Sequence, residues 1–120
     1  MAPGLLAFLL MSRVASAAVG ALSDPIFVLE GEQDKHTDLL TLLDNPTIKG
    51  EMEEFSQSIL RPIRYRKQVV NGLKFIVEMV DDESGVTYSV DILQKPYNSA
   101  QDFLPAPQLL KMMRGPSLEL

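Results

Sequence analysis

The chain has 120 residues, a formal net charge of −5 and no cysteine. A chain of this length suits one domain with a modest core. The acidic balance argues against nucleic acid or an anionic membrane as the main partner, and the absence of cysteine excludes disulfides, thiolate nucleophiles and cysteine-based metal sites.

The N-terminal segment carries a short apolar run over residues 5–11, followed by Ala-Ser-Ala at 15–17. This order is typical of a secretory signal with its cleavage site, although no basic residue precedes the run and Arg13 follows it. The run is too short to span a bilayer. We therefore predict a signal peptide over residues 1–21 and a secreted protein. Without such a signal, a cytoplasmic protein is expected.

Residues 22–35 are predicted to form an N-terminal arm, in which the apolar residues 26–29 suit a short strand that ends at Gly31. Leucines over residues 39–43 then cluster as on one side of a helix. Pro46 either interrupts this helix or begins a new one, with Asn45 as the N-cap.

A second helical pattern follows in the sequence. Ile48, Met52, Phe55 and Ile59 recur at helical spacing, and charged residues between them supply a solvated side. The pattern predicts an amphipathic helix with a narrow apolar stripe. Pro62 is expected to end it.

From residue 63 the apolar period changes to two, which is typical of strands. Asn71-Gly72 between two such runs is a strong hairpin signal. The later predicted elements are a polar turn over residues 81–85, a half-buried antiparallel strand over residues 86–92 broken by Pro96, and a tail over residues 105–120 with a possible strand at its start and a loose end.

A helix followed by an antiparallel meander buries its apolar faces when the sheet wraps across the helix. The predicted class is therefore α+β, with a meander wrapped around one α-helix. The domain is expected to span residues 36–104.

Two adjacent valines, Val69 and Val70, precede the predicted hairpin turn. Adjacent strand residues face opposite sides, so at least one valine is expected to be exposed at the ribbon end. An exposed apolar tip marks a surface that docks into something, whereas the ordinary alternative is a structural turn with a valine in the core. Gly72 suits a positive φ in the turn and leaves room for a partner's backbone.

These residues carry a resemblance to a family. "RKQVVNG", residues 66–72, is similar to the Gln-x-Val-x-Gly signature of the cystatins, which inhibit papain-like cysteine proteases. "KPY", residues 95–97, falls where cystatins carry a Pro-Trp loop. The resemblance covers residues 47–104 and is nearest in pattern to plant-type cystatins, which lack cysteines.

The resemblance implies a wedge that enters the active-site cleft of the protease and blocks it reversibly, in competition with substrate, without being cut. Three elements on one edge make contact: an N-terminal arm with a glycine, the first hairpin and the second hairpin. Gly31 is the first choice for the arm glycine and Gly20 the second. The implied protease-binding residues are Gln68, Val69, Val70, Asn71, Gly72, Pro96, Tyr97 and Gly31.

The sequence also departs from the family pattern. Tyr97 stands where tryptophan is usual, Asn71 where alanine is usual, and Asn45-Pro46 and Gly50 interrupt the expected long helix. These departures keep open a second hypothesis, in which a cystatin-fold protein acts as a non-inhibitory binding module or pro-domain.

Other candidate residues favour ordinary explanations. The single histidine, His36, is expected to be solvated. The acidic residues 81–83 indicate a charged turn rather than a cation site. A basic cluster is expected to pair with the helix glutamates, with steering of an acidic partner as the alternative; it comprises Arg61, Arg64, Arg66 and Lys67.

An enzyme is not expected, because one histidine and no cysteine assemble no nucleophile, base and orienting group. A hydrolase of another α+β fold that uses carboxylates alone is the remaining enzymatic reading. No cofactor or metal is predicted, and neither nucleic acid nor a membrane is expected as a partner. The expected state is a monomer, with a domain-swapped dimer as the alternative.

Overall fold

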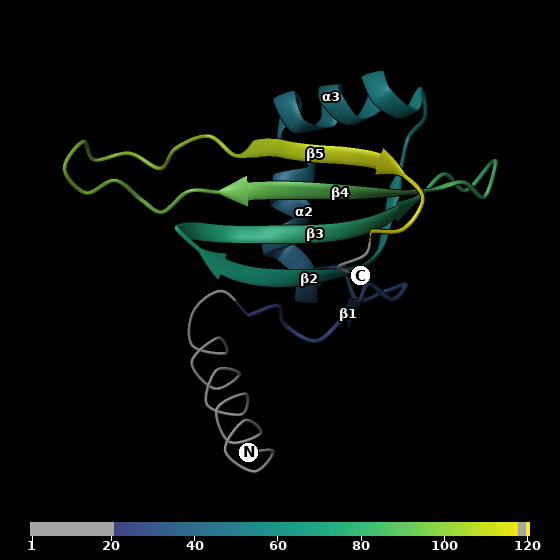
Figure 1. The fold of residues 1–120 in the computed structure, drawn as a ribbon, viewed down its shortest axis with the longest axis horizontal. Coiled ribbons are helices and arrows are strands. Elements are labelled where there is room, and N and C mark those ends of the chain that lie inside the picture. The colour runs from purple at the N-terminus through teal and green to yellow at the C-terminus, as the bar shows by residue number, and fades with distance from the viewer. Residues whose placement is uncertain (1–20, 118–119) are drawn as a thin grey trace, which may run out of the picture.

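The computed structural model describes residues 21–117 and residue 120. The predicted signal peptide over residues 1–21 thus lies, apart from residue 21, outside the described residues. A five-stranded sheet in the order β1-β2-β3-β4-β5 forms the centre of the fold, so strands adjacent in sequence are adjacent in space (Figure 1). All pairings are antiparallel, and the α+β class is confirmed. The strands are β1 Ile26–Phe27, β2 Arg61–Val70, β3 Gly72–Val80, β4 Thr87–Gln94 and β5 Gln108–Arg114.

The helical region is divided where one helix was expected. A 3₁₀ helix, η1 (Gln33–His36), leads into α2 (Thr37–Leu43), and α3 (Pro46–Ser56) follows after a break. Asn45 is the N-cap of α3, and its side-chain oxygen accepts from the backbone N–H groups of Thr47 at 3.0 Å and Ile48 at 3.2 Å. Proline cannot donate a backbone hydrogen bond to a preceding helical turn. The prediction of one helix is therefore wrong, and Pro46 begins a new helix.

Helix α3 ends earlier than expected. It stops at Ser56, where Gln57 takes a left-handed conformation with φ 60°, and Pro62 lies beyond it, in β2 next to a register shift. The predicted apolar stripe is correspondingly short. Ile48 and Met52 are buried, whereas Phe55 and Ile59, which were expected on the stripe, are exposed.

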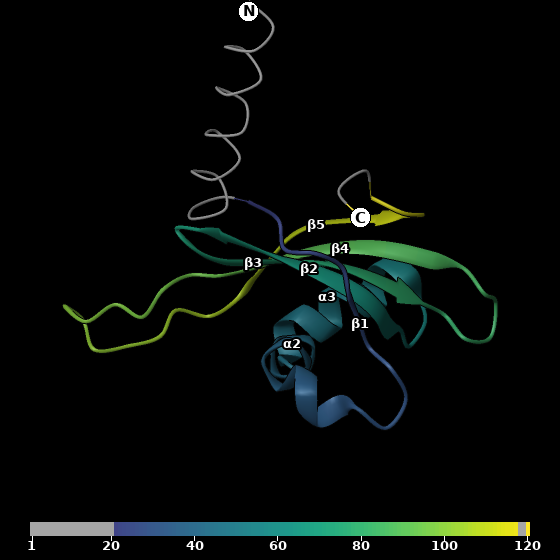
Figure 2. The ribbon, with the colours of Figure 1, turned by 90° about the horizontal axis from the view of Figure 1, so that it is seen from below.

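The core lies between the helices and one face of the sheet. Figures 1 and 2 show both α-helices on this face, with α2 crossing behind the central strands and α3 beside β5. The helices contribute the buried leucines of α2 together with Ile48 and Met52. The sheet residues in this core are Tyr65, Phe75, Val77, Met79, Val90 and Ile92.

The opposite face of β4 is also buried, although a half-buried strand was expected. Ser89 is 2% exposed and Asp91 7%. β4 lies between two neighbouring strands, and the Lys74 ammonium lies 3.7 Å from the Asp91 carboxylate. On this face Arg66 Nη2 donates to the carbonyl oxygen of Leu120 at 3.4 Å, which places the C-terminus on the side away from the helices (Figure 2).

Strand β5 corrects the predicted domain boundary at residue 104. The tail over residues 105–120 was expected to be loose beyond its start, yet Gln108–Arg114 pairs along β4, from Leu93↔Gln108 to Tyr88↔Arg114. The alternation in this segment is weak because its apolar residues include two adjacent pairs. The strand nevertheless has one side that packs on the core, where Leu109 and Met112 are partly buried.

Gly50 offers a test of the helix assignment. It lies inside α3, and a Cβ placed there would meet nothing within 4 Å. Because alanine loses less conformational freedom than glycine on entering a helix, Gly50→Ala is expected to stabilise the protein by about 0.5–1 kcal/mol. Urea unfolding would measure this change. A loss of stability would contradict the helical assignment of residues 46–56.

Candidate docking site

The hairpin tip, residues 68–72, ends β2 and begins β3. Val69 pairs with Leu73, and Val70 pairs with Gly72. The side chain of Val69 is 51% exposed and that of Val70 38% exposed. Since neighbouring strand residues point to opposite faces, each face of the ribbon end carries one of these valines. The expected exposure at the tip is confirmed, and neither valine belongs to the buried core.

Gly72 is required by the chain's own backbone. Its φ is +119°, and a Cβ at this position would lie 2.3 Å from the Gln94 carbonyl oxygen and 2.9 Å from the Lys95 Cα. The sequence suggested that this glycine leaves room for a partner's backbone. In the structure, the backbone that approaches is that of the end of β4, so Gly72 holds the hairpin tip against the following connection.

This connection, residues 95–107, joins β4 to β5 and is called the second loop below. Pro96 and Tyr97 lie on its outgoing arm, and Tyr97 is 54% exposed. The Tyr97 hydroxyl donates to the Asp102 carboxylate, and this bond raises the pKa of the Tyr97 hydroxyl. This bond restrains the orientation of the ring, and about half of the residue remains exposed.

The hairpin tip and the second loop lie at the same end of the sheet (Figure 1). They share a shallow hollow of about 350 Å³, to which Asn71 contributes from the tip and Pro96, Tyr97 and Pro105 from the second loop. The predicted juxtaposition of the two apolar corners is therefore confirmed as geometry. We call the hairpin tip and the second loop together the loop edge.

The N-terminal segment reaches the loop edge, but Gly31 does not. Leu22 forms a bridge with Gln68, and the Ser23 N–H donates to the Lys67 carbonyl at 2.8 Å. From there the chain runs along β2 away from the tip, with Ile26 opposite Tyr65. Gly31 follows β1, past the point where the Val28 N–H bonds to the Ile63 carbonyl, and so lies toward the other end of β2.

Gly31 as the arm glycine at the loop edge is accordingly wrong. The apolar residues 26–29 suggested an arm beside the tip, whereas antiparallel pairing carries residues 26–27 back along β2 toward its start. Gly20, the second choice, lies outside the described residues. Leu22 is the arm residue that the structure places next to the tip.

Two exposed apolar residues on the second loop were missed by the sequence reasoning. Phe103 is 44% exposed and Leu104 60%. They precede Pro105 in a segment that was regarded only as the end of the domain. The sequence does contain a signal for them: the Phe-Leu pair lies between an aspartate and a proline and follows neither strand nor helix periodicity. Such a pair indicates apolar side chains on an exposed loop.

His36 is buried rather than solvated. Its ring is 5% exposed, and Nδ1 lies 2.8 Å from the Tyr65 hydroxyl. The two rings meet edge to face, with centroids 5.6 Å apart. His36 ends η1 directly before α2, so it packs η1 against β2. Its neighbours in the sequence are polar and exposed, and only the histidine is buried. The local sequence therefore gave no indication that His36 belongs to the interior.

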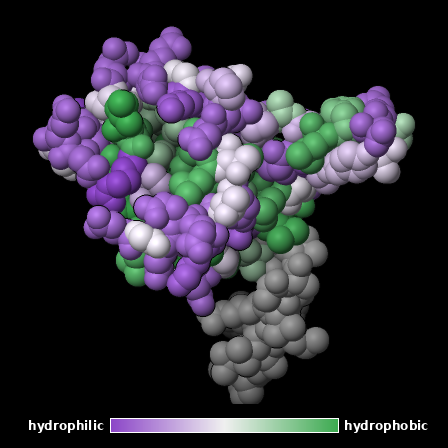
Figure 3. Space-filling model, turned by 180° about the vertical axis from the view of Figure 1, so that it is seen from behind, coloured by the Kyte–Doolittle hydropathy of each residue, from purple (hydrophilic) through white to green (hydrophobic). Residues whose placement is uncertain are grey.

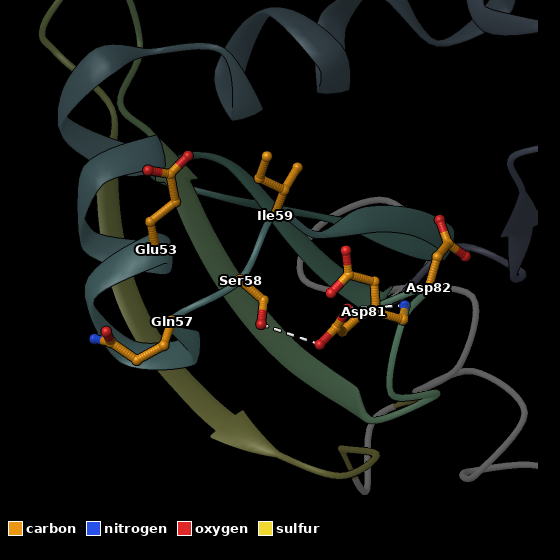
Figure 4. Close-up of a pocket in the computed structure, with 7 residues that line it drawn as sticks. Glu53, Gln57, Ser58, Ile59, Asp81 and Asp82 are labelled. Atoms are coloured by element: carbon orange, nitrogen blue, oxygen red, sulfur yellow. Dashed lines mark hydrogen bonds between the residues drawn. The ribbon is translucent and has the colours of Figure 1, made fainter.

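The acidic turn after β3 is held by its own hydrogen bonds (Figure 4). The Asp81 carboxylate accepts from the Ser58 hydroxyl at 3.0 Å, the Ser84 hydroxyl at 2.8 Å and the Glu83 N–H at 3.0 Å. A hollow of about 640 Å³ lies beside it, lined also by Glu53 and Ile59. No group of three or more histidine, aspartate or glutamate side chains among the described residues is placed to hold a metal ion.

Asp81→Asn tests this turn through pH. Hydrogen bonds from the Ser84 hydroxyl, the Glu83 N–H and the Ser58 hydroxyl lower the pKa of Asp81. The ionised carboxylate therefore stabilises the fold above its unfolded pKa of about 4, and this contribution disappears as pH falls through the lower folded value. We expect Asp81→Asn to lower the melting temperature at pH 7 and to shrink the loss of stability between pH 5 and pH 2. Melting curves that shift in parallel with the wild type over this range would contradict the assignment, and Asp24→Asn, at an exposed position, is the control.

The basic cluster pairs within the fold, although its partners are not the helix glutamates that were expected. Arg61 bonds to Asp82 at 2.8 Å, and Arg64 to Glu78 at 2.8 Å. The Lys67 ammonium lies 2.9 Å from the Asp38 carboxylate of α2. The glutamates of α3 are exposed to solvent instead.

The comparisons with known proteins give no match. No protein-family model matches the chain, and neither a curated protein nor a solved structure matches it. None of the helices among residues 21–117 has both the length and the apolar character that crossing a membrane requires.

Proposed function

We propose that this protein is a reversible, competitive inhibitor of papain-like cysteine proteases, with a cystatin-like fold, and that it inserts the loop edge into the active-site cleft. One observation carries the proposal: the hairpin tip, with two exposed valines, and the exposed Pro96-Tyr97 corner lie at the same end of the sheet, where Asn71 of the tip and the corner line one hollow. The sequence signature at residues 68–72 coincides with that tip.

The loop edge is suited to tight docking because it is ordered before binding. The tip continues two paired strands, and Gly72 packs it against the end of β4. A rigid ribbon loses little conformational entropy when it docks, so burial of Val69 and Val70 appears as affinity. Asn71 adds a polar group, and Tyr97 adds a flat aromatic ring, at the margin of the cleft.

The same order protects the tip from cleavage. A protease binds its substrate as an extended strand, and residues on both sides of Asn71 are already paired with each other in the hairpin. Extracting them would break pairs along β2 and β3, which are joined from end to end. The tip therefore fills the cleft without presenting a peptide bond in a geometry that can be cut.

The second candidate is a binding module or pro-domain of the same fold that does not inhibit. Two observations favour it: the helix is divided at Asn45-Pro46, and the Tyr97 hydroxyl is already engaged by Asp102. On this reading the loop edge still binds a protein, but the partner's groove is not a protease active site.

Titration of papain with the purified protein separates the two candidates. The proposal predicts that the apparent KM for a peptide substrate rises with inhibitor concentration while the maximal rate stays constant. Activity that is unchanged at micromolar inhibitor would reject inhibition of papain and leave the binding module. Recovery of intact chain from the mixture, judged by mass spectrometry, tests the expected resistance to cleavage.

A further inference from the structure

The second loop extends farther than the hairpin tip. Two-strand connections commonly have two to five residues, whereas this one runs through residues 95–107. Figures 1 and 2 show it projecting well beyond the turn between β2 and β3 at the same end of the molecule. A partner that receives the hairpin tip must therefore also meet the outer part of the second loop.

The outer part of this loop has its own hydrogen-bonded structure. Asn98 and Phe103 form an antiparallel bridge with backbone bonds of 2.8 Å and 3.2 Å. The Asn98 side-chain oxygen accepts from the Gln101 N–H at 3.3 Å, and at the base the Gln94 side chain donates to the Pro105 carbonyl at 2.7 Å. These bonds make the loop a short hairpin of its own.

The loop presents apolar side chains to solvent. Phe103 and Leu104 are 44% and 60% exposed, next to Tyr97 at 54%. The turn at the opposite end of the sheet is charged instead, with acidic residues at 81–83. Figure 3 shows hydrophobic residues along the projecting arm and polar ones at its end. Exposure of Phe and Leu on an ordered loop marks a contact surface.

The charge of the loop indicates the chemistry of the surface it meets. Lys95 and Asp102 are its only charged residues, and the Asp102 carboxylate already accepts from Tyr97. The loop therefore has no net charge and matches an apolar, uncharged patch on the partner.

We propose that Phe103 and Leu104, in the outer part of the second loop, form a further contact on an apolar patch of the target protease, outside the cleft that receives the hairpin tip and the Pro96-Tyr97 corner. This inference rests on the proposed function. The further contact sets which proteases are held tightly, because the cleft is common to the class whereas the surface beside it differs among its members. Its loss is expected mainly to accelerate dissociation.

The test compares the full-length wild type with Phe103→Ser/Leu104→Ser, against papain and a panel of papain-like proteases. The matched control is Phe27→Ser/Leu29→Ser, which removes the same two residue types at 57% and 56% exposure on the N-terminal segment, with Leu29 beyond β1. For the protease that the wild type inhibits most strongly, we expect Ki of the loop variant to rise roughly tenfold or more and Ki of the control to stay unchanged. Leu104→Ser alone, which leaves the Phe103 bridge in place, is expected to show a smaller rise in the same direction.

The outcomes separate the two proposals. Inhibition by the wild type with equal Ki for the loop variant overturns the further contact and leaves the proposed function standing. An equal rise for the loop variant and the control also overturns it, because the effect would not be specific to the loop. Absence of inhibition by the wild type against every protease of the panel overturns the proposed function and this inference with it.

Discussion

Gly72→Ala is expected to destabilise the fold by about 2–4 kcal/mol, which is a large part of the stability of a small domain. The alanine would have to adopt φ +119°, and its Cβ would lie 2.3 Å from the Gln94 carbonyl oxygen. The first effect costs about 1–3 kcal/mol. The second forces the tip away from β4, since the obstructing atoms belong to backbone. Chemical denaturation measures the loss of stability.

Gly85→Ala is the matched control for this variant. Gly85 also has a positive φ, +75°, but a Cβ there would meet nothing within 4 Å. Gly85→Ala should therefore lower the free energy of unfolding only by the cost of holding an alanine at positive φ, about 1 kcal/mol. If both alanine variants lose the same stability, the contact between the tip and the end of β4 does not constrain residue 72. Weaker inhibition by Gly72→Ala, but not by Gly85→Ala, is also expected because the two corners of the loop edge would separate.

Val69→Thr/Val70→Thr is expected to raise Ki for papain by at least about tenfold while the melting temperature stays nearly constant. Threonine keeps the β-branched shape that suits a strand, and both side chains are exposed in the free protein, so folding is little affected. In the complex, a hydroxyl buried without a hydrogen-bond partner costs about 1–3 kcal/mol.

Ile59→Thr is the control for the valine variant. Ile59 is 81% exposed and lies beside the acidic turn, away from the loop edge. Its change should leave Ki as it is in the wild type. Equal inhibition by the valine variant and the wild type would mean that the tip does not enter the cleft. A large fall in the melting temperature of the valine variant would mean that the valines support the fold instead.

The sequence predicted the strands well because their signals are local. Alternation on either side of Asn71-Gly72 predicted β2, the tight turn and β3, and their register places Tyr65, Phe75 and Val77 in the core as the period of two requires. The exposure of Val69 and Val70 followed from their position at the end of the ribbon, where neither side chain joins the buried core.

The helices and the C-terminal strand were predicted less well because their limits depend on tertiary packing. Asn45-Pro46 allowed both an interrupted helix and a new one, and only the position of the apolar residues against the sheet selects the second. The end of α3 depends on Gln57, which takes a left-handed conformation. No proline or glycine stands at this position to indicate the end of the helix in the sequence. β5 carries a weak alternation that becomes a strand because β4 offers a free edge.

The parts of the candidate site that follow from local motifs were predicted from the sequence, whereas the parts that depend on tertiary structure were not. A local motif indicated the hairpin tip and Pro96-Tyr97, and the two lie together because Gly72 packs on the backbone of Gln94. The placement of Gly31 depended on the direction of the N-terminal segment along β2, which its sequence does not encode. Phe103 and Leu104 became candidates only once the length and order of the second loop were visible.

Hydrogen exchange of the protein with and without inactivated papain tests the central claim most directly. The account predicts slower exchange on binding in residues 68–72 and in the second loop, and unchanged exchange in the acidic turn at residues 81–85. Protection confined to that turn or to the helices, or no protection at any papain concentration that inhibits, would contradict docking through the loop edge.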